Sequence, residues 1–70
     1  MESLKINGVE REFPAGRFPA TLEELLKILA VDAATVVAEL DGQIIERKDF
    51  AGTKLLKGQS IELVRFVPGG

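Results

Sequence analysis

The fold of this 70-residue chain follows from one stretch, Thr21-Leu22-Glu23-Glu24-Leu25-Leu26-Lys27-Ile28-Leu29. The i, i+3, i+4, i+7 spacing of one helix face is occupied by four leucines: Leu22, Leu25, Leu26 and Leu29. Thr21 and Glu24 have the spacing of a capping box, so the helix should begin just after Thr21. A single apolar helix stripe needs one apolar sheet face to cover it, which favours two packed layers.

The residues before the helix predict a β-hairpin. Leu4 and Ile6 alternate with polar residues, and Asn7-Gly8 separates them from a second alternating run that starts at Val9. Asn-Gly is typical of a type I′ turn, because both central residues of that turn need a positive φ. A two-residue turn would place Ile6 opposite Val9. Residues 14–20 contain two prolines and a glycine and should form a loop.

The residues after the helix predict a second hairpin and a final strand. Residues 35–40 have strand character, and Asp41-Gly42 is again a two-residue turn signal that leads into residues 44–45. The pattern from 46 to 57 is irregular. Three apolar residues in this irregular segment are expected to anchor it in the core: Phe50, Leu55 and Leu56. Gly58 allows a turn into a last strand over residues 60–67.

The predicted order is strand, strand, helix, strand, strand, strand. The first and last strands can lie side by side and parallel at the centre of the sheet, because the connection between them is long. This arrangement is the α+β class, with the β-grasp (ubiquitin-like) fold: a mixed sheet of four to five strands packed on one main helix. Residues 1–70 are expected to form a single domain.

Composition excludes several classes of chemistry. The chain contains no Cys and no His, so it lacks disulfides, thiol nucleophiles, imidazole bases and the usual soft metal ligands. With 46% hydrophobic and 29% charged residues and a net charge of −2, no nucleic-acid footprint is present. The sequence has neither a signal-peptide pattern nor an apolar run of membrane-spanning length. We expect a cytoplasmic protein that binds neither nucleic acid nor membrane.

The last strand shows a change of phase. Ile61 faces the core if the strand is regular, and Val64 and Phe66 then have the opposite parity and point to the open face of the sheet. An exposed Val64–Phe66 pair would form a docking patch for a partner. The alternative is a β-bulge that restores the phase and buries Phe66. Arg65 has the inward parity and should extend its charged end to water.

The sequence ends in Pro68-Gly69-Gly70, directly after this strand. We expect residues 68–70 to form an exposed tail, although a frayed end would have the same composition. A free carboxylate on Gly70 is ionised at neutral pH and can attack the α-phosphorus of ATP. Gly69 and Gly70 have no Cβ and would suit a narrow, water-excluding channel in another protein. Pro68 fixes one φ and keeps the base of the tail extended.

At this point the whole chain resembles the ThiS family, the sulfur carriers of thiazole (thiamine) biosynthesis. The features that match are, in order, Asn7-Gly8, Thr21-Leu22-Glu23-Glu24-Leu25-Leu26, the strand to Leu40, Gln43-Ile44-Ile45, Arg47, Phe50, Leu56, Gly58, Ile61, Leu63 and Gly69-Gly70. The chain departs from the family's usual residues at five positions. Asp41 stands where the family tends to have Asn, Glu46 where it has Pro, Phe50 where it has Trp, Gln59 where it favours Asp, and Pro68 where it favours Gly or Ala.

The resemblance implies a protein co-substrate rather than an enzyme. An E1-like adenylyltransferase (ThiF/MoeB-type) would use ATP to adenylate Gly70, and a persulfide sulfur donor would convert it to a thiocarboxylate. Thiazole synthase (ThiG-type) would then take the sulfur. Gly69 and Pro68 would give access to the reactive end, and Val64 and Phe66 are candidates for docking. No bound cofactor or metal is expected.

Other functions share this pattern. The small subunit of molybdopterin synthase, or a carrier for another sulfur metabolite, would have the same fold and terminus. A ubiquitin-like modifier joined to lysines, or a non-covalent interaction module with an incidental glycine tail, would belong to a different class.

Overall fold

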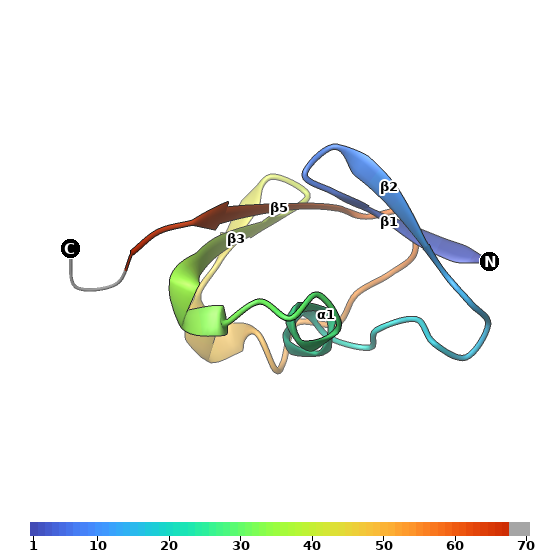
Figure 1. Cartoon of the computed structure of the whole chain (residues 1–70), viewed down its shortest axis with the longest axis horizontal. Helices are drawn as coiled ribbons and strands as arrows, with labels where there is room; N and C mark the ends of the chain where they lie inside the picture. Colours follow the sequence, from blue (N-terminus) through green and yellow to red (C-terminus); the bar gives the residue numbers. More distant parts are fainter. Residues whose placement is uncertain (68–70) are drawn as a thin grey trace.

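Five strands form one sheet in the order β2-β1-β5-β3-β4, and a single helix covers one of its faces (Figure 1). The computed structural model describes residues 1–67. The elements are β1 (Glu2–Ile6), β2 (Val9–Phe13), α1 (Leu22–Ile28), β3 (Val36–Leu40), β4 (Gln43–Ile45) and β5 (Ser60–Arg65), with short 3-10 turns at Ala33–Thr35 and Arg47–Asp49. The central strands β1 and β5 are parallel and the other neighbours are antiparallel. The predicted β-grasp arrangement is confirmed.

The first hairpin forms as its turn residues predict. Asn7 has φ 50° and Gly8 has φ 81°, and Ile6 lies opposite Val9. Because Gly has no side chain and Asn tolerates a left-handed backbone, the turn forms with little strain. The first strand therefore has its inward residues, Leu4 and Ile6, on the face that packs against α1.

Two side chains, those of Thr21 and Glu24, cap the N-terminus of α1. The Glu24 amide N–H donates to Thr21 Oγ1 at 3.2 Å, as the capping-box spacing predicts. The Glu24 carboxylate accepts instead from the Ala20 N–H at 2.8 Å, one residue before the expected Thr21 N–H. Thr21 forms an isolated bridge with Lys54, so the start of the helix is tied to the segment before β5.

The second hairpin also follows its turn signal, with one change at its start. Asp41 has φ 49° and Gly42 has φ 87°, and Leu40 pairs with Gln43. Thr35, expected in the strand, lies instead in the preceding 3-10 turn. The Asp32 main-chain oxygen accepts from both the N–H (2.9 Å) and the hydroxyl (2.7 Å) of Thr35, which holds Thr35 in the turn.

The core lies between α1 and the inner face of the sheet. Its buried side chains are Leu4, Phe13, Leu22, Leu25, Leu26, Val36, Ala38, Phe50, Leu55 and Ile61. Leu56 is a correction, because its side chain is 66% exposed while that of Leu55 is 5% exposed. The Leu55 N–H donates to the Ala20 oxygen, and in an extended segment the next side chain points the opposite way.

β5 runs along the middle of the sheet and ends at Arg65, pointing toward one end of the molecule, while the N-terminus lies at the other end (Figure 1). The chain therefore leaves the sheet from its central strand. Within residues 1–67 no helix has the length and apolarity needed to cross a membrane.

Candidate functional site

The candidate site is the end of β5, where the strand leaves the sheet. On one side β3 pairs with β5 as far as Val36 opposite Arg65, and the Phe66 N–H donates to the Thr35 oxygen at 2.9 Å. On the other side the backbone pairing of β1 with β5 ends at Ile6 opposite Ile61. The last residues of β5 thus depend on β3 alone, except where another group replaces β1.

The Asn7 side chain is that group. Asn7 Oδ1 accepts from the Leu63 N–H at 2.7 Å, and Asn7 Nδ2 donates to the Leu63 oxygen at 3.3 Å. The Asn7 backbone N–H donates to the Ile61 oxygen at 2.8 Å. Since the backbone of Asn7 has turned away into the hairpin, its side-chain amide takes the place of the next peptide group of β1. The pairing of β5 on this side is thereby extended by two residues, from Ile61 to Leu63.

Replacing Asn7 by Gly should loosen the exit of β5 without straining the turn, because Gly accepts the positive φ of Asn7. Two hydrogen bonds to Leu63 are lost, so we expect the free energy of unfolding to fall by about 1–2 kcal/mol. Asn7→Asp keeps an acceptor for the Leu63 N–H but sets a second oxygen against the Leu63 carbonyl, and it should be destabilised as well. Amide hydrogen exchange at Leu63 should become faster in the Gly variant. Unchanged exchange at Leu63 would contradict the role of the Asn7 amide.

Val64 and Phe66 lie on the open face of the sheet, away from α1. Val64 is 60% exposed and Phe66 is 46% exposed. The pairing of β3 with β5 is continuous from Leu40 opposite Ile61 to Val36 opposite Arg65, with no bulge. The regular-strand interpretation is therefore confirmed and the bulge that would bury Phe66 is wrong. Their role in docking stays a prediction.

The exposed apolar surface is larger than the sequence interpretation indicated. Val37 lies directly opposite Val64 on β3, and Ile44 on β4 has the same outward orientation. Val37 is 43% exposed and Ile44 is 69% exposed. We call the four residues Val37, Ile44, Val64 and Phe66 the open-face patch. Strand alternation could have identified the two added members, because each stands next to an inward-facing residue.

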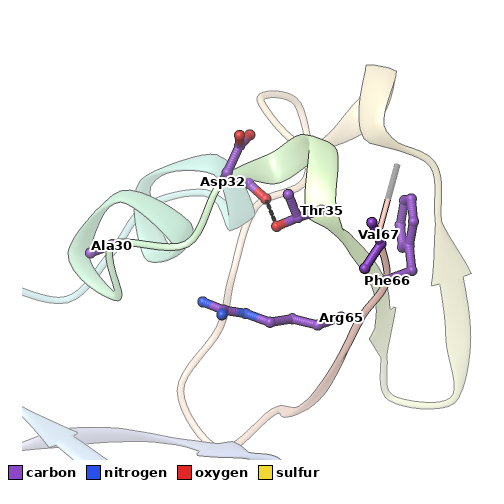
Figure 2. Close-up of a pocket in the computed structure, with 6 residues that line it drawn as sticks. All are labelled: Ala30, Asp32, Thr35, Arg65, Phe66 and Val67. Atoms are coloured by element: carbon purple, nitrogen blue, oxygen red, sulfur yellow. Dashed lines mark hydrogen bonds between the residues drawn. The ribbon is translucent and has the colours of Figure 1, made fainter. Parts of the chain in front are cut away.

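The other side of the strand end holds a surface pocket (Figure 2). Its lining residues are Ala30, Asp32, Thr35, Arg65, Phe66 and Val67. Figure 2 shows the Arg65 side chain extended beneath the segment that follows α1, on the side opposite the Phe66 ring. Arg65 is exposed, as the snorkelling expectation requires, and it makes no ion pair with another residue of the described chain.

Three predicted site residues, Pro68, Gly69 and Gly70, lie outside the described residues. Within residues 1–67 no group of three or more carboxylates, imidazoles or thiols is arranged to hold a metal ion. No buried side-chain nitrogen or oxygen in that part of the chain lacks a hydrogen-bond partner.

Comparison with known proteins assigns this arrangement to a family. A family model described as the ThiS family matches residues 4–70. The chain belongs to the ThiS family. The crystal structure of a ThiS thiamine biosynthesis protein from Geobacter metallireducens is 33% identical, with a TM-score of 0.79, and the match covers 97% of this chain and 99% of that one. A solution NMR structure of a thiamine biosynthesis protein from the same organism is also 33% identical, with a TM-score of 0.77, and the match covers 97% and 87% of the two chains.

A curated relative extends the comparison. A thiazole synthase from Paramagnetospirillum magneticum is 37% identical over 67 residues, which cover 96% of this chain and 20% of the relative. The ThiS-family chain therefore spans about a fifth of the length of that curated relative. The resemblance inferred from sequence to the ThiS family is confirmed.

Two of the departures from the usual ThiS residues touch each other. Asp41 Oδ2 accepts from Gln59 Nε2 at 3.2 Å, and Asp41 Oδ1 accepts from the Ser60 N–H at 2.9 Å. In this chain a carboxylate at Asp41 therefore faces an amide at Gln59. These hydrogen bonds attach the β3–β4 turn to the start of β5.

Proposed function

We propose that this ThiS-family protein is a sulfur carrier for thiazole formation in thiamine biosynthesis, and that the Gly70 carboxylate is its reactive group. Family membership supports the sulfur-carrier role. The observation that supports the site is the position of β5, a central strand held by β3 and by β1 with Asn7, which leads directly to the terminal residues. A rigid strand before the tail limits the conformational entropy that the tail loses on entering a partner.

The proposed chemistry has three steps. A Gly70 carboxylate oxygen attacks the α-phosphorus of ATP, a C–O–P linkage forms, and pyrophosphate leaves. A persulfide sulfur then attacks the carbonyl carbon, AMP leaves with its electron pair, and an acyl disulfide remains. A thiol then attacks the donor-side sulfur of the S–S bond that came from the persulfide, which breaks this bond, releases the thiocarboxylate and leaves a disulfide between the thiol and the donor. The E1-like adenylyltransferase supplies the catalysis, and the chain is the co-substrate.

The chain's own residues position this reaction. Gly69 and Gly70 pass through a narrow channel that excludes water from the acyl-adenylate, and Pro68 keeps the base of the tail extended. Val64 and Phe66, with the rest of the open-face patch, bind the partner surface beside the channel. The four residues after Phe66 span at most about 14 Å when extended. The bound ATP must therefore lie within that distance of the docking surface.

We propose a thiazole synthase (ThiG-type) as the sulfur acceptor. The support is a curated thiazole synthase, one stretch of which is similar to 96% of this chain. This comparison favours thiazole formation over the molybdopterin alternative. We also propose a cytoplasmic location, because activation requires ATP. No cofactor is expected to bind the carrier itself.

Intact-mass measurement tests the function. The 70-residue protein is incubated with the E1-like enzyme of its source organism, ATP and a persulfide donor. We expect one oxygen to be replaced by sulfur, and the added sulfur to be lost when thiazole synthase and its other substrates are supplied. The same mixture without ATP is the control. Attachment to another chain would indicate a modifier, and an unchanged mass would contradict the carrier function.

A further inference from the structure

The open face of the sheet has an uneven distribution of charge. Strand alternation and the register of the sheet place five charged side chains at outward positions on the strands: Glu10 and Glu12 on β2, Lys5 on β1, Glu39 on β3 and Glu62 on β5. Four of the five are carboxylates. The whole chain has a net charge of only −2, with nine Lys and Arg residues. Most of those cations therefore lie elsewhere.

Two of the carboxylates face each other. Glu39 on β3 is the direct cross-strand partner of Glu62 on β5. Directly opposite residues on one face have Cβ atoms about 4.5–5.5 Å apart, and like charges at this separation destabilise a sheet. Glu39 is half-buried and Glu62 is exposed, so the repulsion is only partly screened by water.

No described residue compensates this pair. Neither carboxylate forms an ion pair or accepts a side-chain hydrogen bond within residues 1–67. Lys5, the lysine on this face, lies opposite Glu10 on β2 and Ser60 on β5. We therefore expect the pair to lower the stability of the isolated protein, because no ion pair or side-chain hydrogen bond within residues 1–67 offsets the repulsion.

The pair is also continuous with the open-face patch. Ile44 lies directly opposite Glu39 on β4, so Ile44, Glu39 and Glu62 form one cross-strand row. Val37 and Val64 form the next outward row toward the tail. The face thus presents two carboxylates bordered by exposed apolar side chains, and one of them, Glu62, is on the strand that leads toward Gly70.

We infer that the open face binds a partner surface that places one cationic side chain, an Arg or a Lys, between Glu39 and Glu62, while apolar side chains of that partner cover the open-face patch. This inference rests on the proposed function, in which the partner is the E1-like adenylyltransferase. A planar guanidinium can bind both carboxylates at once, which would remove the repulsion between them. A partner with an acidic or purely apolar surface would leave the pair uncompensated and would be rejected.

The test uses the double variant Glu39→Gln/Glu62→Gln, which keeps side-chain size and removes both charges. The dissociation constant for the E1-like enzyme is measured by calorimetric titration, at low and at high salt. We expect it to rise about tenfold or more at low salt, because hydrogen bonds between charged groups contribute on this scale. We also expect the melting temperature of the isolated variant to rise, because the repulsion is gone. If the pair had only a structural role, removal of its charges would not both weaken binding and stabilise the fold.

The matched control is Glu10→Gln/Glu12→Gln, which changes the net charge equally on the same face but away from the patch. Its affinity should stay near that of the parent. Equal weakening of both double variants, no weakening of either, or a lower melting temperature for Glu39→Gln/Glu62→Gln would overturn the inference. Parent protein that binds with this dependence yet is not adenylated would contradict the proposed function and leave the docking inference supported. Parent protein that does not bind would contradict both.

Discussion

Deletion of Gly70 will leave the fold intact and abolish ATP-dependent activation. The buried core runs from Leu4 to Ile61, so the shortened chain should melt at the temperature of the parent. The terminal carboxylate, however, is withdrawn by one residue, about 3.3–3.6 Å. Because reacting atoms must approach within about 3–3.5 Å, we expect activation to fall by more than about 100-fold. ATP–pyrophosphate exchange measures activation, and thermal unfolding measures the fold.

Gly70→Ala separates chain length from channel width. This variant keeps the carboxylate at the end of a 70-residue chain and adds one methyl group, so it should fold normally and be activated poorly. Activation of the shortened chain at the parent rate would show that the Gly70 carboxylate is not the substrate. Parent rates for Gly70→Ala would contradict the narrow channel but not the carrier function.

The double variant Val64→Thr/Phe66→Ser should bind the E1-like enzyme at least about 30-fold more weakly, because central apolar anchors of an interface typically contribute 2 kcal/mol or more each. Thr keeps the β-branched shape of Val64, and both side chains are exposed, so the melting temperature should change little. The Michaelis constant for the carrier in ATP–pyrophosphate exchange should rise, while the rate at saturation stays near that of the parent.

Val9→Thr is the matched control for this patch. Val9 is 69% exposed on β2, at the edge of the sheet away from the patch. It should bind like the parent. If the Val9 variant is weakened as much as the double variant, exposed apolar area in general, and not the open-face patch, determines binding.

The fold could be predicted from sequence because its local signals are strong and agree with one another. Asn7-Gly8 and Asp41-Gly42 both adopt the positive φ that their turn type requires. Thr21 caps α1, and the leucine stripe of the helix is buried apart from its last member, the half-buried Leu29. With two hairpins and one helix fixed locally, the parallel pairing of the first and last strands was the economical way to complete the sheet.

The interactions that sequence could not reveal depend on long-range register. Asn7 and Leu63 are 56 residues apart in the sequence. Nothing in the local pattern shows that the Asn7 side-chain amide would take the place of a peptide group of β1. The meeting of Glu39 with Glu62 likewise requires the alignment of β3 on β5, and a shift of one residue would separate them. Leu56 was misplaced because the segment from Glu46 to Lys57 has no regular period from which to assign a face.

The parallel pairing of β1 and β5 has a mechanical consequence. A partner that draws the end of the chain into its channel pulls β5 along its own axis. The hydrogen bonds on the two sides of β5, to β1 with Asn7 and to β3, are then loaded in shear. They resist the force together and do not break one after another. We therefore expect the domain to stay folded while a partner holds the end of the chain.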